Sequence, residues 1–441
     1  MDLDSPAGTV LVSAVVLVLL GLAVAAVAST RAAPLLGMHQ DGPWWFSPRG
    51  GRTQGLVLSY LAGAVAVGAL VFLVVAAAVP DGGPLAWTCA WASVAVVVAV
   101  TVARFGKLVL SVATGGRALL GDPAPEDFVD PDDALDDLDV RAARDAASRG
   151  EWRPAAHLLA ATEDPDVRHH RTEVLAQAAL RRRAWLDAWL REEPGSAVAH
   201  TVHASLLAQH AWELRGADFE PREVERFLSA LDDAEASARH AVTLDAADPG
   251  PHAVLVAIAR GQQVGHDELE RRLADLLALA PRHLGGHEAA LQFRCAKWFG
   301  SEDEMFAHAR AGSALARPGD ALALLVVTAH LEHALALGMR SEKAAARHWA
   351  AAETRAEIAD AVARWRGTDG PSPVGAVQGH NLLAFTAWLA DDADAAAEHL
   401  AVTRRHLATW PWAVAGDPSE VHAVVQQWAR QTTRPKAAVA S

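Results

Sequence analysis

The sequence predicts an all-α protein in two parts: three transmembrane helices, followed by a large helical domain. Two observations carry this prediction. The first 120 residues contain three long apolar segments without charge, and the chain after residue 140 repeats apolar residues at steps of three and four among Ala, Leu, Glu and Arg. We find no convincing run of alternating apolar and polar residues, so we expect no sheet.

The three apolar segments have the length of membrane spans. Their cores run over Val10–Ala28, Leu56–Val79 and Leu85–Ala103. About 20 helical residues cross the hydrocarbon layer of roughly 30 Å, and none of the three segments has the polar stripe of a soluble core helix. Aromatic residues such as Tyr60 and Trp87 near the span ends agree with an interfacial position. The sequence therefore predicts a multi-pass protein of the lipid bilayer, with a membrane region over residues 1–120.

The basic residues predict the orientation of the spans. The loop after the first span carries three arginines, and the chain directly after the third span carries Arg104, Lys107 and Arg117. The positive-inside rule then places the N-terminus outside and the C-terminal domain in the cytoplasm of the cell. As an alternative, Ala26–Ala28 has the small residues of a signal-peptide cleavage site, and cleavage there would reverse the remainder. A signal peptide also needs a positive n-region, which this N-terminus lacks.

Charge and cysteine usage exclude several classes of function. The net charge is −14, which argues against a nucleic-acid-binding surface. The two cysteines, Cys89 and Cys295, cannot build a disulfide framework or a thiolate metal site. The excess of arginine over lysine and the abundance of Ala, Gly and Val are typical of a high-GC bacterial genome.

An acidic linker follows the membrane region over residues 121–139. It contains nine acidic residues and no basic one, and three prolines interrupt it. We interpret it as a solvated spacer that holds the domain away from an anionic membrane surface. The alternative is a divalent-cation site, because carboxylates suit Ca²⁺, but the ligand spacing and glycine of an EF-hand are missing.

The helical domain is predicted over residues 140–430, with a disordered tail over residues 431–441. Prolines and a Gly/Pro cluster after Gly370 separate the helices. The apolar stretch Ala323–Thr328 could pass for a strand, but its Ala- and Leu-rich flanks favour a helix.

One segment resembles the tetratricopeptide repeat. In Gly150–Ala155 a glycine is followed by a polar residue, a tryptophan and, five positions on, an alanine. Glycine would make the turn between two antiparallel helices, the ring would fill the gap, and alanine would let the backbones approach. Ala241–Pro249 and Leu276–Pro281 resemble repeat ends, and their final prolines are 32 residues apart, close to the repeat length of about 34.

The resemblance covers residues 140–410 only in part. Trp189–Pro194 resembles a third repeat end, but the next such end follows 55 residues later, which a long insertion around Gly216–Arg226 would explain. The resemblance implies a TPR-like solenoid: a stacked helix-pair superhelix whose concave face binds peptides or proteins. A non-repeating helical bundle is the alternative. Phe293–Gly300 is also similar to segments of uncharacterised actinobacterial membrane proteins, a resemblance that implies no activity.

No catalytic or cofactor-binding constellation is evident. Nucleophile elbows, Walker loops and dinucleotide fingerprints are absent. Among the twenty histidines, three groups invite a metal interpretation: His200 with His203; His283 and His287 with Glu288; His330 and His333 with Glu332. A zinc-protease helix needs two histidines four apart with a glutamate after the first, whereas Glu288 follows the second histidine and Gly285–Gly286 interrupts the helix, so we predict no metal ligand and interpret these histidines as surface or core residues. Similarly, Ser301 before three acidic residues predicts a helix N-cap.

The candidate contact patch for a protein partner is a pair of tryptophans beside a basic run. Trp185 and Trp189 lie one helical turn apart, next to Arg181, Arg182 and Arg183. Aromatic anchors often carry binding energy, although tryptophans in a helical domain can equally belong to the core.

These observations predict a membrane-anchored, non-enzymatic adaptor or scaffold that presents a helical-repeat domain to an unknown protein partner. No cofactor is predicted. Two alternatives stay open: an enzyme with a histidine-containing, metal-binding site in the helical domain, and a structural membrane subunit whose spans matter more than its domain.

Overall fold

The computed structural model describes residues 123–215, 221–367 and 375–433. The three predicted spans, the basic loop between the first two and the tail beyond residue 433 lie outside these ranges. The described helices belong to one compact unit, to which the described residues between Pro125 and Ala413 and those from Asp417 to Thr433 contribute.

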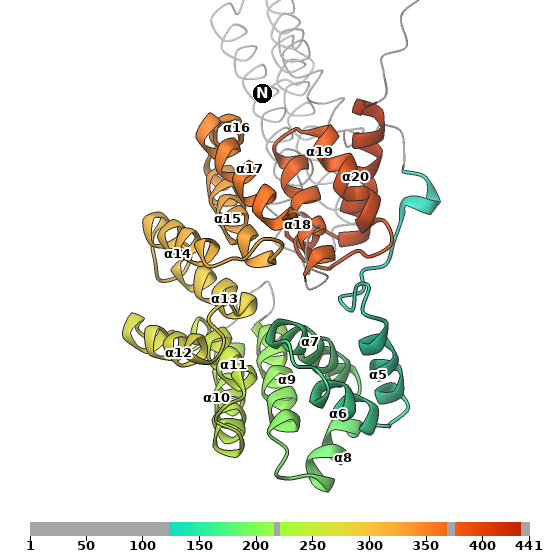
Figure 1. The fold of residues 1–441 in the computed structure, drawn as a ribbon, viewed down its shortest axis with the longest axis vertical. Coiled ribbons are helices and arrows are strands. Elements are labelled where there is room, and N and C mark those ends of the chain that lie inside the picture. Colours follow the sequence, from blue (N-terminus) through green and yellow to red (C-terminus); the bar gives the residue numbers. More distant parts are fainter. Residues whose placement is uncertain (1–122, 216–220, 368–374, 434–441) are drawn as a thin grey trace, which may run out of the picture. The chain divides into compact units, whose positions relative to one another are not determined.

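Regular structure in the described residues is helical throughout, as the sequence predicted (Figure 1). Short 3-10 turns accompany the α-helices. The sixteen α-helices are α5 (Leu138–Ser148), α6 (Arg153–Ala160), α7 (Pro165–Arg181), α8 (Ala184–Glu192), α9 (Ala197–Arg215), α10 (Pro221–Leu244), α11 (Pro249–Ala259), α12 (His266–Leu279), α13 (Leu284–Arg294), α14 (Glu302–Ala314), α15 (Leu325–Arg340), α16 (Glu342–Ala350), α17 (Ala352–Arg366), α18 (Ala376–Leu389), α19 (Ala393–Thr403) and α20 (Pro418–Thr433).

The helices from α5 to α16 stack as consecutive pairs (Figure 1). The first helix of each pair contacts the first helix of the next, which makes a continuous row through α5, α7, α9, α11, α13 and α15. The second helices, such as α10 and α14, pack mainly against the row helices before and after them. This arrangement buries one apolar stripe per helix against its neighbours and extends the core from pair to pair.

The turn between α5 and α6 has the parts expected from Gly150–Ala155. Gly150 has a φ of +94°, in the left-handed region that favours glycine. Trp152 and Ala155 are both buried, with 5% and 0% of their surfaces exposed. The ring fills the interior of the pair and the small residue permits close packing, which is the physical role predicted for each.

The long interval after Pro194 contains the two longest helices of the described residues. Between the repeat-like ends at Pro194 and Pro249, α9 has 19 residues and α10 has 24, and only residues 216–220 separate them. Of the predicted insertion around Gly216–Arg226, residues 216–220 lie outside the described ranges and residues 221–226 belong to α10. The pair simply extends further than its neighbours.

Within the described part of the acidic segment, two carboxylates contact the helical domain instead of solvent alone. Asp127 is 4% exposed and accepts hydrogen bonds from the guanidinium of Arg430 on α20, the closer at 2.5 Å. Asp137 caps α5 by accepting from the backbone N–H of Val140 at 3.0 Å. Its other carboxylate oxygen lies 2.7 Å from Nε of Arg171 on α7. The described part of the segment is therefore attached to the helical domain, because arginines distant in the sequence neutralise its carboxylates.

One described segment, Ala321–Arg340, is long and apolar enough to cross a membrane by length and composition alone. It comprises a 3-10 turn and α15, and 61% of its most apolar window is buried inside the domain. It also contains Ala323–Thr328, so the prediction of helix over strand for that stretch is confirmed. Its burial against α13, α14, α16 and α17 explains its apolar composition.

Candidate functional site

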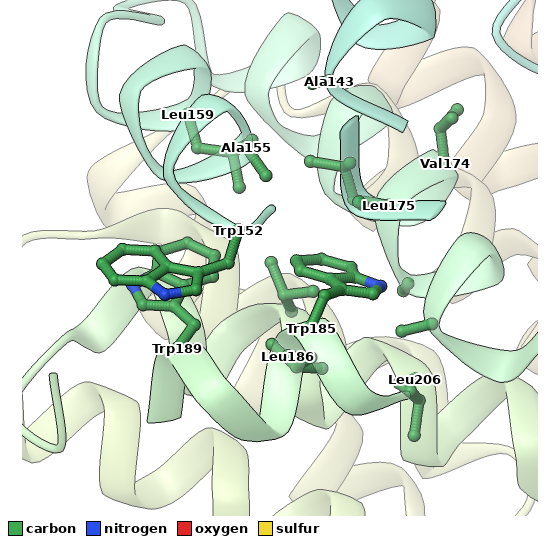
Figure 2. Packing of buried hydrophobic residues seen from close by; sticks show 14 of the residues in the cluster. Ala143, Trp152, Ala155, Leu159, Val174, Leu175, Trp185, Leu186, Trp189 and Leu206 are labelled. Atoms are coloured by element: carbon green, nitrogen blue, oxygen red, sulfur yellow. The ribbon is translucent and has the colours of Figure 1, made fainter. Parts of the chain in front are cut away.

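Trp185 and Trp189 belong to the core and cannot form a contact patch for a partner. Each has 1% of its surface exposed. Figure 2 shows the indole of Trp189 stacked on that of Trp152, with Trp185 beside them, and the first two ring centroids are 5.7 Å apart. We call these three residues the tryptophan cluster. The prediction was wrong because helical spacing places both rings on one face without revealing what covers that face.

The three arginines beside this cluster are exposed, but two of them bind the domain itself. Arg182 donates to the backbone carbonyl of Ser148. Arg183 forms an ion pair with Asp187 at 2.9 Å. Arg181 is exposed at the end of α7.

The histidines around α13 serve local structure. His283 is the N-cap of α13, where its Nδ1 accepts the backbone N–H of Gly286 at 3.1 Å, and burial lowers its pKa to about 3. His287 donates from Nε2 to the carbonyl of Pro281 at 3.1 Å. Nδ1 of His283 and Nε2 of His287 are therefore both hydrogen-bonded to backbone groups. The neighbouring Glu288 is half-buried, and burial raises its pKa to about 7.

His200 and His203 also have separate partners. Nε2 of His200 donates to the carbonyl of Pro194 at 3.0 Å, which is the same relation that His287 has to Pro281. His203 shares a hydrogen bond with Ser237 at 3.0 Å, and burial lowers its pKa to about 4.

The third histidine group opens into a pocket. This pocket has a volume of about 330 Å³ and lies between α14, α15, α16 and α17. Three histidines, His330, His333 and His348, line it together with Phe306, Arg310 and carboxylates including Glu357. We call it the histidine pocket.

A helical hairpin brings the three rings together. Ser341 ends α15 and caps α16, accepting the backbone N–H of Ala344 at 3.3 Å. His333 lies eight residues before this turn and His348 seven residues after it, so the two antiparallel helices place them opposite each other. Their ring centroids are 4.7 Å apart. His330, one turn before His333 on the same helix face, lies 5.1 Å from His348 by the same measure.

A chain of hydrogen bonds runs through the pocket from Arg310 to His348. Arg310 holds both oxygens of Glu357, at 2.7 and 3.0 Å. The carboxylate of Glu357 lies 3.1 Å from Nε2 of His330, and Nδ1 of His330 lies 3.2 Å from Nε2 of His348. The ionised carboxylate accepts the Nε2 proton of His330, which leaves the lone pair of Nδ1 to accept a proton from His348.

The electrostatics favour neutral imidazoles beside an ionised carboxylate. Burial lowers the pKa of His330, although Glu357 opposes this shift. Burial also lowers the pKa of His348, to about 4. The hydrogen bond from Arg310 lowers the pKa of Glu357. At neutral pH the two rings therefore present both lone pairs and N–H groups.

Two further side chains shape the pocket. Phe306 is 8% exposed and packs edge-on against His330, with ring centroids 5.0 Å apart. His333 approaches Glu302 at 3.4 Å through Nδ1. Glu332, which the sequence grouped with these histidines, points elsewhere and forms an ion pair with Lys297 at 2.7 Å. The predicted N-cap at Ser301 is confirmed, since its side chain accepts the backbone N–H of Glu304.

Chemically, a neutral imidazole oriented by a carboxylate can accept, donate or relay a proton, and it can bind a transition metal. As the side chains stand, no group of three or more His, Cys, Asp or Glu in the described ranges is arranged to hold a metal ion. Comparison with protein-family models, with curated proteins and with solved structures gave no match. What the histidine pocket can do is therefore argued from the arrangement of its own residues.

Sequence reasoning found His330 and His333 but missed His348, Arg310 and Glu357. The last two come from α14 and α17 and are 47 residues apart. His348 could have been found from the position of Ser341, because a capped turn midway between two histidines pairs them across a hairpin. No local signal in the sequence pairs Arg310 with Glu357.

Proposed function

We propose that this chain is a membrane-anchored adaptor or scaffold, in which a TPR-like helical-repeat domain binds a protein partner on the cytoplasmic side of a multi-pass membrane region. The observation that supports the proposal most is the stack of helix pairs with its continuous row from α5 to α15. Such a stack presents a long surface built from one helix per pair, which is the design of repeat proteins that bind peptides and proteins. The turn at Gly150–Ala155 adds local support.

The cytoplasmic placement is tested by labelling an engineered thiol in intact cells. The native Cys295 is unsuitable, because it is 3% exposed and burial raises the pKa of its thiol to about 12. Ala161, which is exposed at the end of α6, is a better position. We expect Ala161→Cys to react with a membrane-impermeant maleimide only after cell lysis, with the unsubstituted chain as control. Reaction in intact cells would place the domain outside and overturn the orientation.

Partner binding is tested with photo-crosslinking residues at exposed positions of the full-length protein in its native membrane. We expect adducts of one discrete mass from positions on the row helices α7, α9 and α11, and few from α8, α10 and α12. Equal yields from both sets, or no discrete adduct from either, would contradict an adaptor that uses the stacked row.

A further inference from the structure

The contact between His330 and His348 has the spacing of two ligands on one metal ion. Their facing nitrogens, Nδ1 and Nε2, are 3.2 Å apart. Two imidazole nitrogens bound tetrahedrally at about 2.0–2.1 Å from a Zn²⁺ ion are separated by roughly 3.3–3.4 Å. An ion bound to both nitrogens would lie beside the line that joins them, because this line is shorter than two Zn–N bonds, so both rings would turn about their side-chain bonds to bind it.

Two of the rings also have the carboxylate support that metal-binding histidines use. Glu357 bonds the nitrogen of His330 that faces away from His348, at 3.1 Å. Glu302 lies 3.4 Å from Nδ1 of His333, which leaves Nε2 of that ring as its possible ligand atom. A histidine ligand typically donates its other N–H to a carboxylate or carbonyl, which fixes the ring and raises its basicity.

The pocket supplies access and a favourable charge. It is open to solvent, so an ion and its water ligands have an entry path. Its lining contains Glu302, Asp303, Glu353 and Glu357 against the single cation Arg310. The excess of carboxylates attracts divalent cations, while imidazole ligands favour Zn²⁺ and similar transition metals over Ca²⁺ or Mg²⁺.

We propose that the histidine pocket is a binding site for a divalent transition-metal ion, with Nδ1 of His330 and Nε2 of His348 as ligands and His333 joining as the third. On binding, the proton of His348 moves from Nε2 to Nδ1, so the ring stays neutral and its lone pair faces the ion. His333 turns toward the ion about its side-chain bonds, and its ring already lies 4.7 Å from that of His348. Water occupies the position that faces the pocket.

The test is equilibrium dialysis of the purified full-length protein against Zn²⁺, with bound zinc measured per chain. We expect one site, lost in His348→Gln and at least tenfold weaker in His333→Gln. His348 is half-buried on the hairpin surface, so its substitution spares the core. His380→Gln is the matched control: it disrupts another close histidine pair, in which Nδ1 of His380 lies 2.9 Å from Nδ1 of His399. That variant should bind zinc as the native chain does.

Two substitutions in the Arg310–Glu357 ion pair distinguish the role of Glu357 in orienting a metal ligand from the contribution of the ion pair to the stability of the fold. Glu357→Gln and Arg310→Gln both break the Arg310–Glu357 contact, but only the first removes the carboxylate that orients His330. We expect Glu357→Gln to weaken zinc binding 10- to 100-fold and Arg310→Gln to leave it within about threefold. Absence of a saturable site, zinc binding unchanged in His348→Gln or His333→Gln, loss of the site in His380→Gln, or equal effects of the two ion-pair variants would each overturn the proposal.

Discussion

The tryptophan cluster and the histidine pocket occupy equivalent settings, between packed helix pairs, yet one is closed and the other open. Around Trp152, Trp185 and Trp189 the space is filled by indole rings and aliphatic side chains (Figure 2). Between α14 and α17 the comparable space holds imidazoles, carboxylates and a guanidinium, and a pocket of about 330 Å³ remains.

Physical chemistry explains the difference. Apolar rings gain free energy from any close contact, so they pack until no space is left. Polar side chains must each meet a partner at a fixed distance and angle, as Glu357 and His330 do, and they leave gaps where partners are not available. The same helix-pair architecture therefore gives a stabilising interior at the tryptophan cluster and a pocket with ligand-binding or proton-transferring side chains at the histidine pocket.

The largest expected loss of stability comes from a substitution in the tryptophan cluster. Trp189→Ala removes a ring that is 1% exposed and stacked on Trp152. We expect a loss of about 3–5 kcal/mol in the free energy of unfolding, because a cavity remains. Chemical unfolding of the full-length protein, followed by circular dichroism, measures it. A loss below about 1 kcal/mol would mean that the ring is not part of the core.

Acidification should next distinguish the tryptophan cluster from the buried histidines of α19 and α20, which lie outside the histidine pocket. Burial lowers the pKa of His399 and of His422 to about 4, against about 6.5 in the unfolded chain. Between these two pKa values the unfolded chain binds more protons than the folded protein. The folded protein therefore has its full free energy of unfolding above about pH 6.5 and loses part of it as the pH falls toward 4. At pH 5, each of these two histidines should lower the free energy of unfolding by about 1–2 kcal/mol relative to its value at neutral pH.

Hydrogen exchange at pH 7 and pH 5, corrected for the intrinsic rate, locates this effect. Amides of α18–α20 should lose protection at pH 5 more than those of α5 and α6. His422→Asn should flatten the pH dependence of unfolding, because its ring is buried between Thr403 and Gln426. An unchanged slope in this variant would show that His422 is not protonated on unfolding.

Substitution in the histidine pocket should cost much less than substitution in the tryptophan cluster. Glu357 and Arg310 are both partly exposed, at 27% and 57% of their side-chain surfaces. We expect Glu357→Gln to change the free energy of unfolding by about 1 kcal/mol or less, because water screens the Arg310–Glu357 ion pair. Chemical unfolding measures this cost, and a value near that of Trp189→Ala would show that the pocket is a structural core.

The smallest effect is expected at the exposed arginines beside the tryptophan cluster. Replacing Arg181 by Ala should change the free energy of unfolding by no more than about 0.5 kcal/mol, since its side chain lies on the surface. The same unfolding measurement applies, with Trp189→Ala as the sensitive reference. A larger loss would mean that the basic run supports the fold.

The sequence by itself determined the features of this protein that depend on interactions between residues close in the chain. Three- and four-residue periodicity predicted helices, Ser301 predicted a cap, and Gly150 predicted a turn, because each depends on residues within one or two helical turns. The helix assigned to Ala323–Thr328 follows from the same reasoning.

Tertiary structure alone decided which faces are covered and which charges meet. Nothing near Trp185 in the sequence reveals the helices that bury it, and the partner of Asp127 is Arg430, 303 residues away. Glu357 reaches His330 from a different helix in the same way. Burial and long-range pairing depend on how helices pack in space, and side-chain periodicity within one helix carries no information about its neighbours.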